Sequence, residues 1–253
     1  MLKFIGTGSA FNQDLGNTSA YIKDGETLLL IDCGETVFQR IKEIKLLDDV
    51  KKVYIAITHN HSDHIGSLGS LVEYLYFIKE IVPNFVLANG DNAVEQEKSL
   101  RGYLTSVGVE EDKYDFVYGD MMEEVLPNLL KVEMPQVKHS KVLTSYAVEL
   151  YFKDLIVYYT GDQNDLSYLK KIAKKLKEND LVYTDCSLRD YKNRIHVTLA
   201  ELEEIFTEEQ RDKVICMHFE NYNTYSEAKN AGFKVSNKEL SKEEILKRIA
   251  EHN

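Results

Sequence analysis

The chain has 253 residues, of which 43% are hydrophobic and 29% are charged, a composition typical of a soluble globular protein with a sizeable core. Its formal net charge of −11 disfavours a protein that grips long nucleic acid through a basic face. No apolar run approaches the ~18–20 residues of a membrane span, and the N-terminus lacks the apolar segment of a secretory signal, so we expect no membrane association.

Strand-like and helix-like segments alternate along the chain. In the first part, apolar runs predict strands over residues 2–5, 19–22, 27–31, 52–57 and 85–88, and apolar residues at helical spacing predict helices over 36–47, 65–79 and 93–104. A strand-rich part follows over 115–118, 130–134, 145–152 and 155–160. The pattern then predicts helix 166–177, strand 181–185, helix 199–208, strand 213–217 and two closing helical segments.

This order of elements favours two sheets packed together with helices outside. Only three prolines and no low-complexity tract interrupt the chain. We therefore expect an α/β protein with one domain over residues 1–253, an αββα sandwich of two mixed sheets with outer helices. Cys33, Cys186 and Cys216 are far apart and odd in number, so we expect no disulfide framework and a reducing cytoplasm.

The segment Thr58-His59-Asn60-His61-Ser62-Asp63-His64 gathers three of the seven histidines and one aspartate directly after an apolar run. Imidazoles and a carboxylate crowded at a strand end suit a pair of transition-metal ions. Alternate residues His59 and His61 can point together from an extended loop and hold one ion. Asp63 and His64, a short turn later, can hold the second. The alternative interpretation is a polar surface loop that is rich in histidine.

Three residues elsewhere have positions that can complete such a site. His139, Asp162 and His218 each follow an apolar segment or lie in a loop between two, and Asp162 can bridge two cations through its two oxygens. Taken singly, they have simpler interpretations, as a surface histidine, a turn residue and a core histidine. Their order and their shared position at strand ends favour metal binding.

The order of HNHSDH, His139, Asp162 and His218 resembles the metallo-β-lactamase fold superfamily. The likeness extends to segments 4–11 (FIGTGSAF), 17–21 (NTSAY) and 30–34 (LIDCG), and it covers nearly the whole chain. These features are typical of the phosphodiesterase branch, which includes the tRNA 3′-processing endonuclease RNase Z and small cyclic-nucleotide phosphodiesterases. Among the latter, the sequence is most similar to the phage anti-Pycsar enzymes, which destroy cyclic pyrimidine signals.

The resemblance implies the metallo-β-lactamase fold, two zinc ions and a set of ligands. One zinc would be held by His59, His61 and His139, and the other by Asp63, His64 and His218, with Asp162 bridging. Manganese or iron suits the same ligand types. Position 61 is histidine rather than glutamate, which disfavours the di-iron flavoprotein branch. The resemblance also implies a homodimer and, for a phage-encoded chain, the host cytoplasm.

Two residues are expected to act in catalysis. His196 precedes Val197 and Thr198, an HxT setting in which the phosphodiesterase branch carries a histidine that protonates the leaving oxygen or binds the phosphate. Without the resemblance, His196 would be a histidine near a helix N-terminus with no special task. Asp63 is expected to hold one metal and to orient the nucleophile or accept its proton.

The spacing after His139 bears on the substrate. RNase Z enzymes carry a long tRNA-binding arm after the matching position, whereas only 22 residues, 140–161, separate His139 from Asp162. The missing arm and the acidic charge favour a small phosphodiester. We expect hydrolysis of cyclic nucleotides such as cCMP, cUMP, cAMP and cGMP to linear nucleoside monophosphates, as a phage counter-defence activity. The loop 219–222 beside His218 is the nearest candidate for binding the base.

Three alternatives stay open at this point. The first is an RNase Z-like endoribonuclease acting on tRNA 3′ ends. The second is a hydrolase of thioesters, lactones or β-lactams on the same scaffold, against which the HxT setting of His196 argues. The third is a binding protein that only sequesters a nucleotide, although such a protein has no need of a full set of metal ligands.

Overall fold

The computed structural model describes residues 1–12, 14–122, 125–189 and 195–238. The first part of the chain forms a six-stranded mixed sheet in which the strands follow one another in chain order. These strands are β1 (Lys3–Gly6), β2 (Ser19–Asp24), β3 (Thr27–Ile31), β4 (Lys52–Ala56), β5 (Asn84–Leu87) and β6 (Asp115–Tyr118). The pairs from β1 to β3 are antiparallel, and those from β3 to β6 are parallel.

A second six-stranded sheet has the order β14-β13-β12-β11-β10-β7. Its strands are β7 (Leu129–Glu133), β10 (Val148–Phe152), β11 (Ile156–Tyr159), β12 (Leu181–Asp185), β13 (Val214–Met217) and β14 (Lys234–Val235). β10 pairs antiparallel with both β7 and β11, and the pairs from β11 to β14 are parallel. A short antiparallel ribbon joins β8 (Gln136–Val137) to β9 (Ser145–Tyr146).

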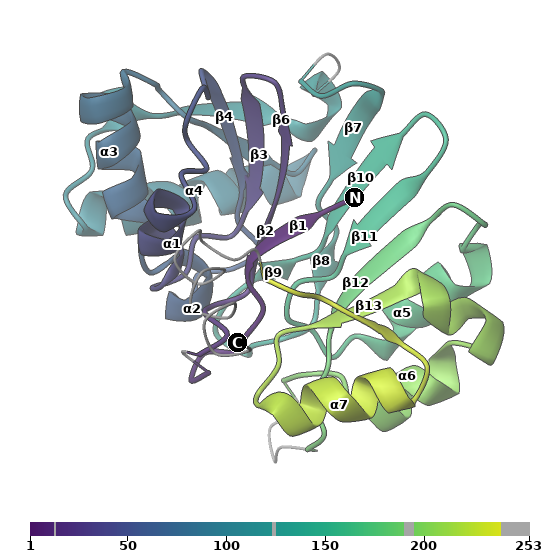
Figure 1. Cartoon of the computed structure of the whole chain (residues 1–253). Helices are drawn as coiled ribbons and strands as arrows, with labels where there is room; N and C mark the ends of the chain where they lie inside the picture. The colour runs from purple at the N-terminus through teal and green to yellow at the C-terminus, as the bar shows by residue number, and fades with distance from the viewer. Residues whose placement is uncertain (13, 123–124, 190–194, 239–253) are drawn as a thin grey trace.

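Helices cover the outer face of each sheet (Figure 1). Those beside the first sheet are α1 (Val37–Glu43), α3 (Leu68–Lys79) and α4 (Asp91–Ser106), and those beside the second are α5 (Leu166–Lys175), α6 (Leu199–Ile205) and α7 (Tyr222–Asn230). A one-turn helix, α2 (Ser62–Ile65), links β4 to α3. The expected αββα sandwich of two mixed sheets with outer helices is confirmed.

Strand β3 shows how the sequence specifies these layers. Successive side chains of a strand point to opposite faces, and a strand covered on both faces is apolar throughout. Leu28 and Leu30 pack in the core beneath α1, α3 and α4, whereas Leu29 and Ile31 pack in the core between the two sheets. A third apolar core lies between the second sheet and α5, α6 and α7.

The structure differs from the predicted elements at several places. The helix predicted over 65–79 is broken at Gly66 and Ser67, so that α2 and α3 are separate. The strand predicted over 145–152 is divided at Ala147, because its first two residues pair with β8 and the rest joins the second sheet. Of the two closing helical segments, α7 is present and is followed by β14; the second lies outside the described residues.

Two further expectations concern membrane association and the number of domains. Among the described residues, no helix is long and apolar enough to cross a bilayer. The single domain over residues 1–253 stays a prediction.

The fold brings the ends of distant strands to one edge. Strands β3 and β4 run parallel to each other in the first sheet, and β11, β12 and β13 run parallel to one another in the second, so the carboxyl ends within each set lie at one edge. The segments that follow β4 and β13 meet there, where His218 Nε2 lies 3.2 Å from an oxygen of Asp63. The polar segments that follow these strands face one another at this edge (Figure 1). This is the usual place for a functional site in sheets built from parallel strands.

Candidate metal centre

The histidine-rich loop follows β4 and is mostly enclosed by the protein. His59, Asp63 and His64 are buried, and His61 is half-buried. His61 has extended backbone angles and stands directly before α2, whose first turn carries Asp63 and His64. A buried loop with this content argues against the alternative of a solvated, histidine-rich surface loop.

His59, His61 and His139 form a first group of candidate ligands. His61 Nδ1 lies 2.9 Å from His59 Nε2 and 3.1 Å from His139 Nε2. Burial lowers the pKa of His59 well below its usual value and that of His139 to about 4, so both rings are neutral and have lone pairs to offer. Nitrogens bound to one tetrahedral zinc lie about 3.3 Å apart, given Zn–N bonds of about 2.0–2.1 Å. The three nitrogens therefore fit one cation.

Asp63, His64, Asp162 and His218 form a second group, in which all four residues are buried. His218 Nε2 lies 3.2 Å from an oxygen of Asp63 and 3.2 Å from Asp162 Oδ2. His64 Nε2 is also 3.2 Å from Asp162 Oδ2. Burial pushes the pKa of Asp162 upward, but the charges of His218 and His64 outweigh it and hold that pKa well below the usual range. An ionised carboxylate ringed by imidazoles suits a divalent cation.

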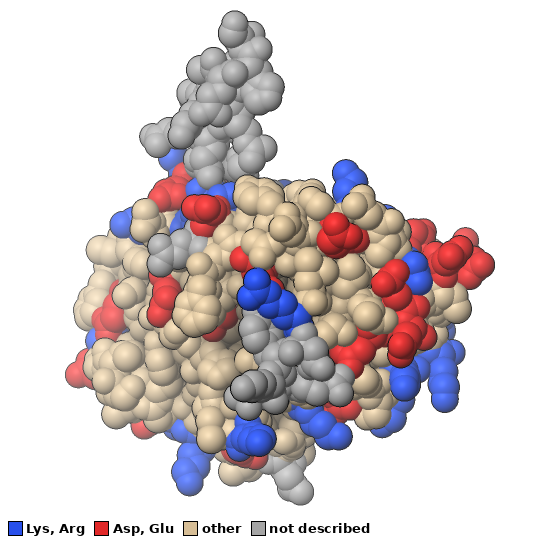
Figure 2. Space-filling view, turned by 90° about the horizontal axis from the view of Figure 1, so that it is seen from below, with Lys and Arg blue, Asp and Glu red and all other residues tan. Residues whose placement is uncertain are grey.

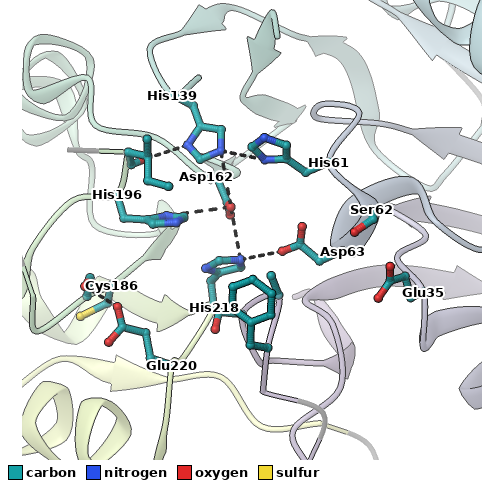
Figure 3. Close-up of a pocket in the computed structure, with 15 residues that line it drawn as sticks. Glu35, His61, Ser62, Asp63, His139, Asp162, Cys186, His196, His218 and Glu220 are labelled. Atoms are coloured by element: carbon teal, nitrogen blue, oxygen red, sulfur yellow. Dashed lines mark hydrogen bonds and ion pairs between the residues drawn. The ribbon is translucent and has the colours of Figure 1, made fainter. Parts of the chain in front are cut away.

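Asp162 connects the two groups. Its Oδ2 atom lies 3.9 Å from His139 Nε2, on the side of the first group (Figure 3). Its Oδ1 atom is buried and has no hydrogen-bond partner among the described residues. A buried carboxylate oxygen without a partner is costly. A cation at this place would satisfy it, and the position agrees with the bridging role that the resemblance implies.

Groups behind the ligands fix their orientation. Asp32, at the end of β3, accepts a hydrogen bond from His64 Nδ1 at 2.9 Å and from the Thr58 backbone N–H at 2.8 Å. The Nδ1 atom of His139 donates to the Ile195 carbonyl at 2.6 Å, which turns Nε2 toward the site. The sequence prediction assigned no task to Asp32, although its position at the end of a strand next to β4 was a usable signal.

His196 lies beside the ligand groups and is held by a carboxylate. Its Nδ1 atom is 2.9 Å from Asp185 Oδ2 and 3.9 Å from Asp162 Oδ2. Burial alone would lower the pKa of His196, but the hydrogen bond to Asp185 and the charges of Asp162 and Asp185 raise it to about 9. Asp185 ends β12, between the strands that carry Asp162 and His218, and sequence reasoning missed it.

Five of the seven candidate ligands, together with His196, line one pocket of about 740 Å³ (Figure 3). His61, Asp63, His139, Asp162, His196 and His218 point toward one another on its floor, and Glu35 and Glu220 stand farther out. Base binding by the loop 219–222 stays a prediction, but one of its residues does not fit that role. Phe219 is fully buried, with its ring centroid 5.4 Å from that of Tyr225 in the helical core, so it cannot contact a base.

All seven side chains predicted as ligands therefore converge, although they come from four separate parts of the chain. Their role as metal ligands stays a prediction, and so do the catalytic roles of Asp63 and His196. Two groups that hold or orient them, Asp32 and Asp185, were not anticipated.

Gly34 is expected to be irreplaceable by alanine, because the histidine loop packs directly on it. A Cβ at position 34 would meet the Asp63 carbonyl oxygen at 1.9 Å and Asn17 Cβ at 2.8 Å. Gly34→Ala should lower the free energy of unfolding by about 1–3 kcal/mol or more and displace Asp63. Thermal unfolding and metal content measure the effect.

Gly102→Ala is the matched control for Gly34→Ala. Gly102 lies inside α4, and a Cβ there would meet nothing within 4 Å. This change should raise the free energy of unfolding by about 0.5–1 kcal/mol, because alanine favours a helix interior over glycine. If both variants had the same stability and the same metal content, the close contact at Gly34 would have no importance.

Comparison with known proteins places this site in a family context. The sequence model of one family, Anti-Pycsar protein Apyc1, matches residues 1–239. A relative with that name from Paenibacillus sp. (strain J14) is 30% identical over 225 residues, with 86% of this chain and 88% of the relative covered. Another from Bacillus phage 010DV004 is 28% identical over 238 residues, with coverage of 86% and 88%.

Solved structures resemble this one in fold at low sequence identity. The metallo-β-lactamase fold protein YhfI from Bacillus subtilis superposes with a TM-score of 0.68 at 17% identity, covering 95% of each chain. The short form of human tRNase Z gives a TM-score of 0.62 at 16% identity, covering 94% of this chain and 97% of the other. These likenesses confirm the metallo-β-lactamase fold.

Proposed function

Because the chain belongs to the Anti-Pycsar protein Apyc1 family, we propose that it hydrolyses cyclic mononucleotides to linear nucleoside monophosphates. Its family, its fold and its cluster of histidine and aspartate side chains make it a metal-dependent hydrolase. One observation supports the more specific proposal that the substrate is a phosphodiester. Asp162 joins two groups of candidate ligands and lies 3.9 Å from the His196 ring, so a phosphate at the metals would meet a proton donor in the same pocket.

Each residue of the floor has a task in this proposal. Two divalent cations, for which zinc suits the ligands, would supply Lewis acidity and a water of lowered pKa. Asp63 orients the attacking water and accepts its proton. His196 donates a proton to the departing 3′ oxygen, and Asp185 keeps its ring charged and turned toward the pocket. Hydrolysis adds water across one P–O bond and leaves a linear monophosphate.

The size and charge of the surroundings favour a small substrate over tRNA. A pocket of about 740 Å³ is in the range that encloses one small molecule. The segment between His139 and Asp162 folds back into β9, β10 and β11 and so leaves no length for a protruding arm. On the described part of the face drawn in Figure 2, Lys and Arg side chains are interspersed with Asp and Glu rather than gathered in one basic patch.

A product assay tests the proposed function. The purified, metal-loaded protein is incubated with cCMP, cUMP, cAMP and cGMP, and separately with a precursor tRNA, and the products are separated after denaturation. We expect linear monophosphates from the cyclic nucleotides and intact tRNA. Cleavage of the RNA alone would identify a nuclease, and return of intact cyclic nucleotide after tight binding would identify a sequestering protein. Metal analysis and light scattering on the same sample measure the two zinc ions and the homodimer that we propose.

A further inference from the structure

The rim of the catalytic pocket carries one aromatic side chain that the reaction does not use. Phe11 lines the pocket, and 97% of its surface is exposed. Apart from the histidines, it is the one aromatic residue among the described residues that line this pocket. Single exposed apolar side chains are common on protein surfaces, so exposure alone carries no inference. What distinguishes Phe11 from other exposed apolar residues is that the backbone around it is anchored beside the pocket.

Phe11 stands in a tight turn that is tied to the metal site. The N–H of Asn12 donates to the Ser9 carbonyl at 3.1 Å, which closes a four-residue turn with Phe11 in its third position. Both ends of this turn bind the same acceptor, the carbonyl of Phe219. The Ser9 N–H reaches it at 3.0 Å and the Asn12 side-chain amide at 3.0 Å.

This acceptor links the turn to a candidate ligand. Phe219 follows His218 directly in sequence, and its own N–H donates to the Thr7 carbonyl at 2.9 Å. The buried Phe219 ring is fixed in the helical core, so its backbone is a firm support. The backbone position of Phe11 is therefore set relative to His218, and its exposed side chain starts from a fixed point at the rim of the pocket.

We propose that Phe11 is the platform on which the nucleobase stacks, an inference that rests on the proposed function. When the phosphate lies among the candidate ligands on the pocket floor, the base extends toward the rim. An aromatic ring on an anchored turn offers every base a face to stack on without selecting its hydrogen-bonding edge. Stacking also covers an apolar ring that is otherwise fully hydrated. Phe11 would thus bind the base of purine and pyrimidine substrates alike, and the larger purine face would gain more.

The test compares two substrates that differ only in the base. One is cAMP, and the other is 1-O-methylribose 3′,5′-cyclic phosphate, which keeps the phosphate ring and lacks a base. We expect Phe11→Ala to raise the KM for cAMP roughly 5- to 150-fold, the range for loss of one stacked base. The ratio of kcat/KM for cAMP to that for the base-free diester should fall by the same factor. Phe11→Trp should keep the ratio at or above its original value.

A matched control is available on α3. Phe77 is also exposed, at 62%, and lies against Lys113 away from this pocket, so Phe77→Ala should leave the ratio unchanged. An unchanged ratio in Phe11→Ala, or an equal loss on both substrates, would overturn the stacking role. Absence of cyclic-nucleotide turnover in the unaltered protein would instead overturn the proposed function, and the inference with it.

Discussion

Replacing Asp63 by alanine is expected to abolish hydrolysis while the protein stays folded. The carboxylate faces the pocket and lies 3.2 Å from His218 Nε2 and 3.4 Å from His64 Nε2. Its removal takes away a candidate ligand and the group that orients the attacking water. His61→Ala should have a comparable effect, because the His61 Nδ1 atom lies within 3.1 Å of both other nitrogens of the first group. We expect each change to lower kcat/KM on the order of 10³-fold or more.

The fold should survive because these side chains lie at the open edge of the sheets rather than in an apolar core. Circular dichroism and thermal unfolding would show this, and metal analysis would report the lost cation. Asn60→Ala is the matched control in the same loop. Its side chain, between the two histidines, donates to Ser99 Oγ at 2.9 Å rather than to the metal groups. Asn60→Ala should keep its activity, whereas full activity in Asp63→Ala or His61→Ala would remove the site assignment.

The candidate ligands could be predicted because each stands in a recognisable local sequence pattern. A ligand at the carboxyl end of a strand stands directly after an apolar run, as His218 does after β13 and Asp162 soon after β11. The period-2 geometry of an extended segment likewise explains why His59 and His61 face one place while Asn60 faces another. The layered fold was predictable for the same reason, since doubly covered strands such as β3 are apolar at four successive positions, Leu28 to Ile31.

Other features depend on pairing between distant segments, so no local sequence pattern predicts them. Strands β8 and β9 are each two residues long, and a strand of that length is too short to show an alternation of apolar and polar residues. Asp185 also ends an apolar strand, but its contact with His196 forms only where the chain returns to meet it, which no local pattern shows. The sequence does not tell on which side of the backbone the Phe219 ring lies, so it cannot show which residues of the loop 219–222 are able to reach a base. The structure buries that ring and uses its carbonyl to support Phe11 instead.

Asp185 is expected to act only through His196, and a double-mutant cycle can show it. His196→Ala should lower kcat by about 10²–10⁴-fold, the usual contribution of a positioned acid. Asp185→Asn should give a smaller loss, because the ring remains but is less often charged and less firmly held. In the His196→Ala background, Asp185→Asn should cost almost nothing further. Equal additional losses in both backgrounds would show that Asp185 supports the site by another route.

The pH dependence of kcat distinguishes proton donation by His196 from a role in positioning alone. His196 must carry a proton in order to donate it, so the kcat of the unaltered enzyme should fall as the pH rises through the pKa of this ring. Asp185 and Asp162 raise that pKa to about 9, whereas bound cations repel the proton, so the fall should lie below pH 9 in the loaded enzyme. Asp185→Asn removes the hydrogen bond to a charged partner, so burial lowers the pKa and the fall should move to lower pH. A basic limb at the same pH in both proteins would mean that another group limits the reaction.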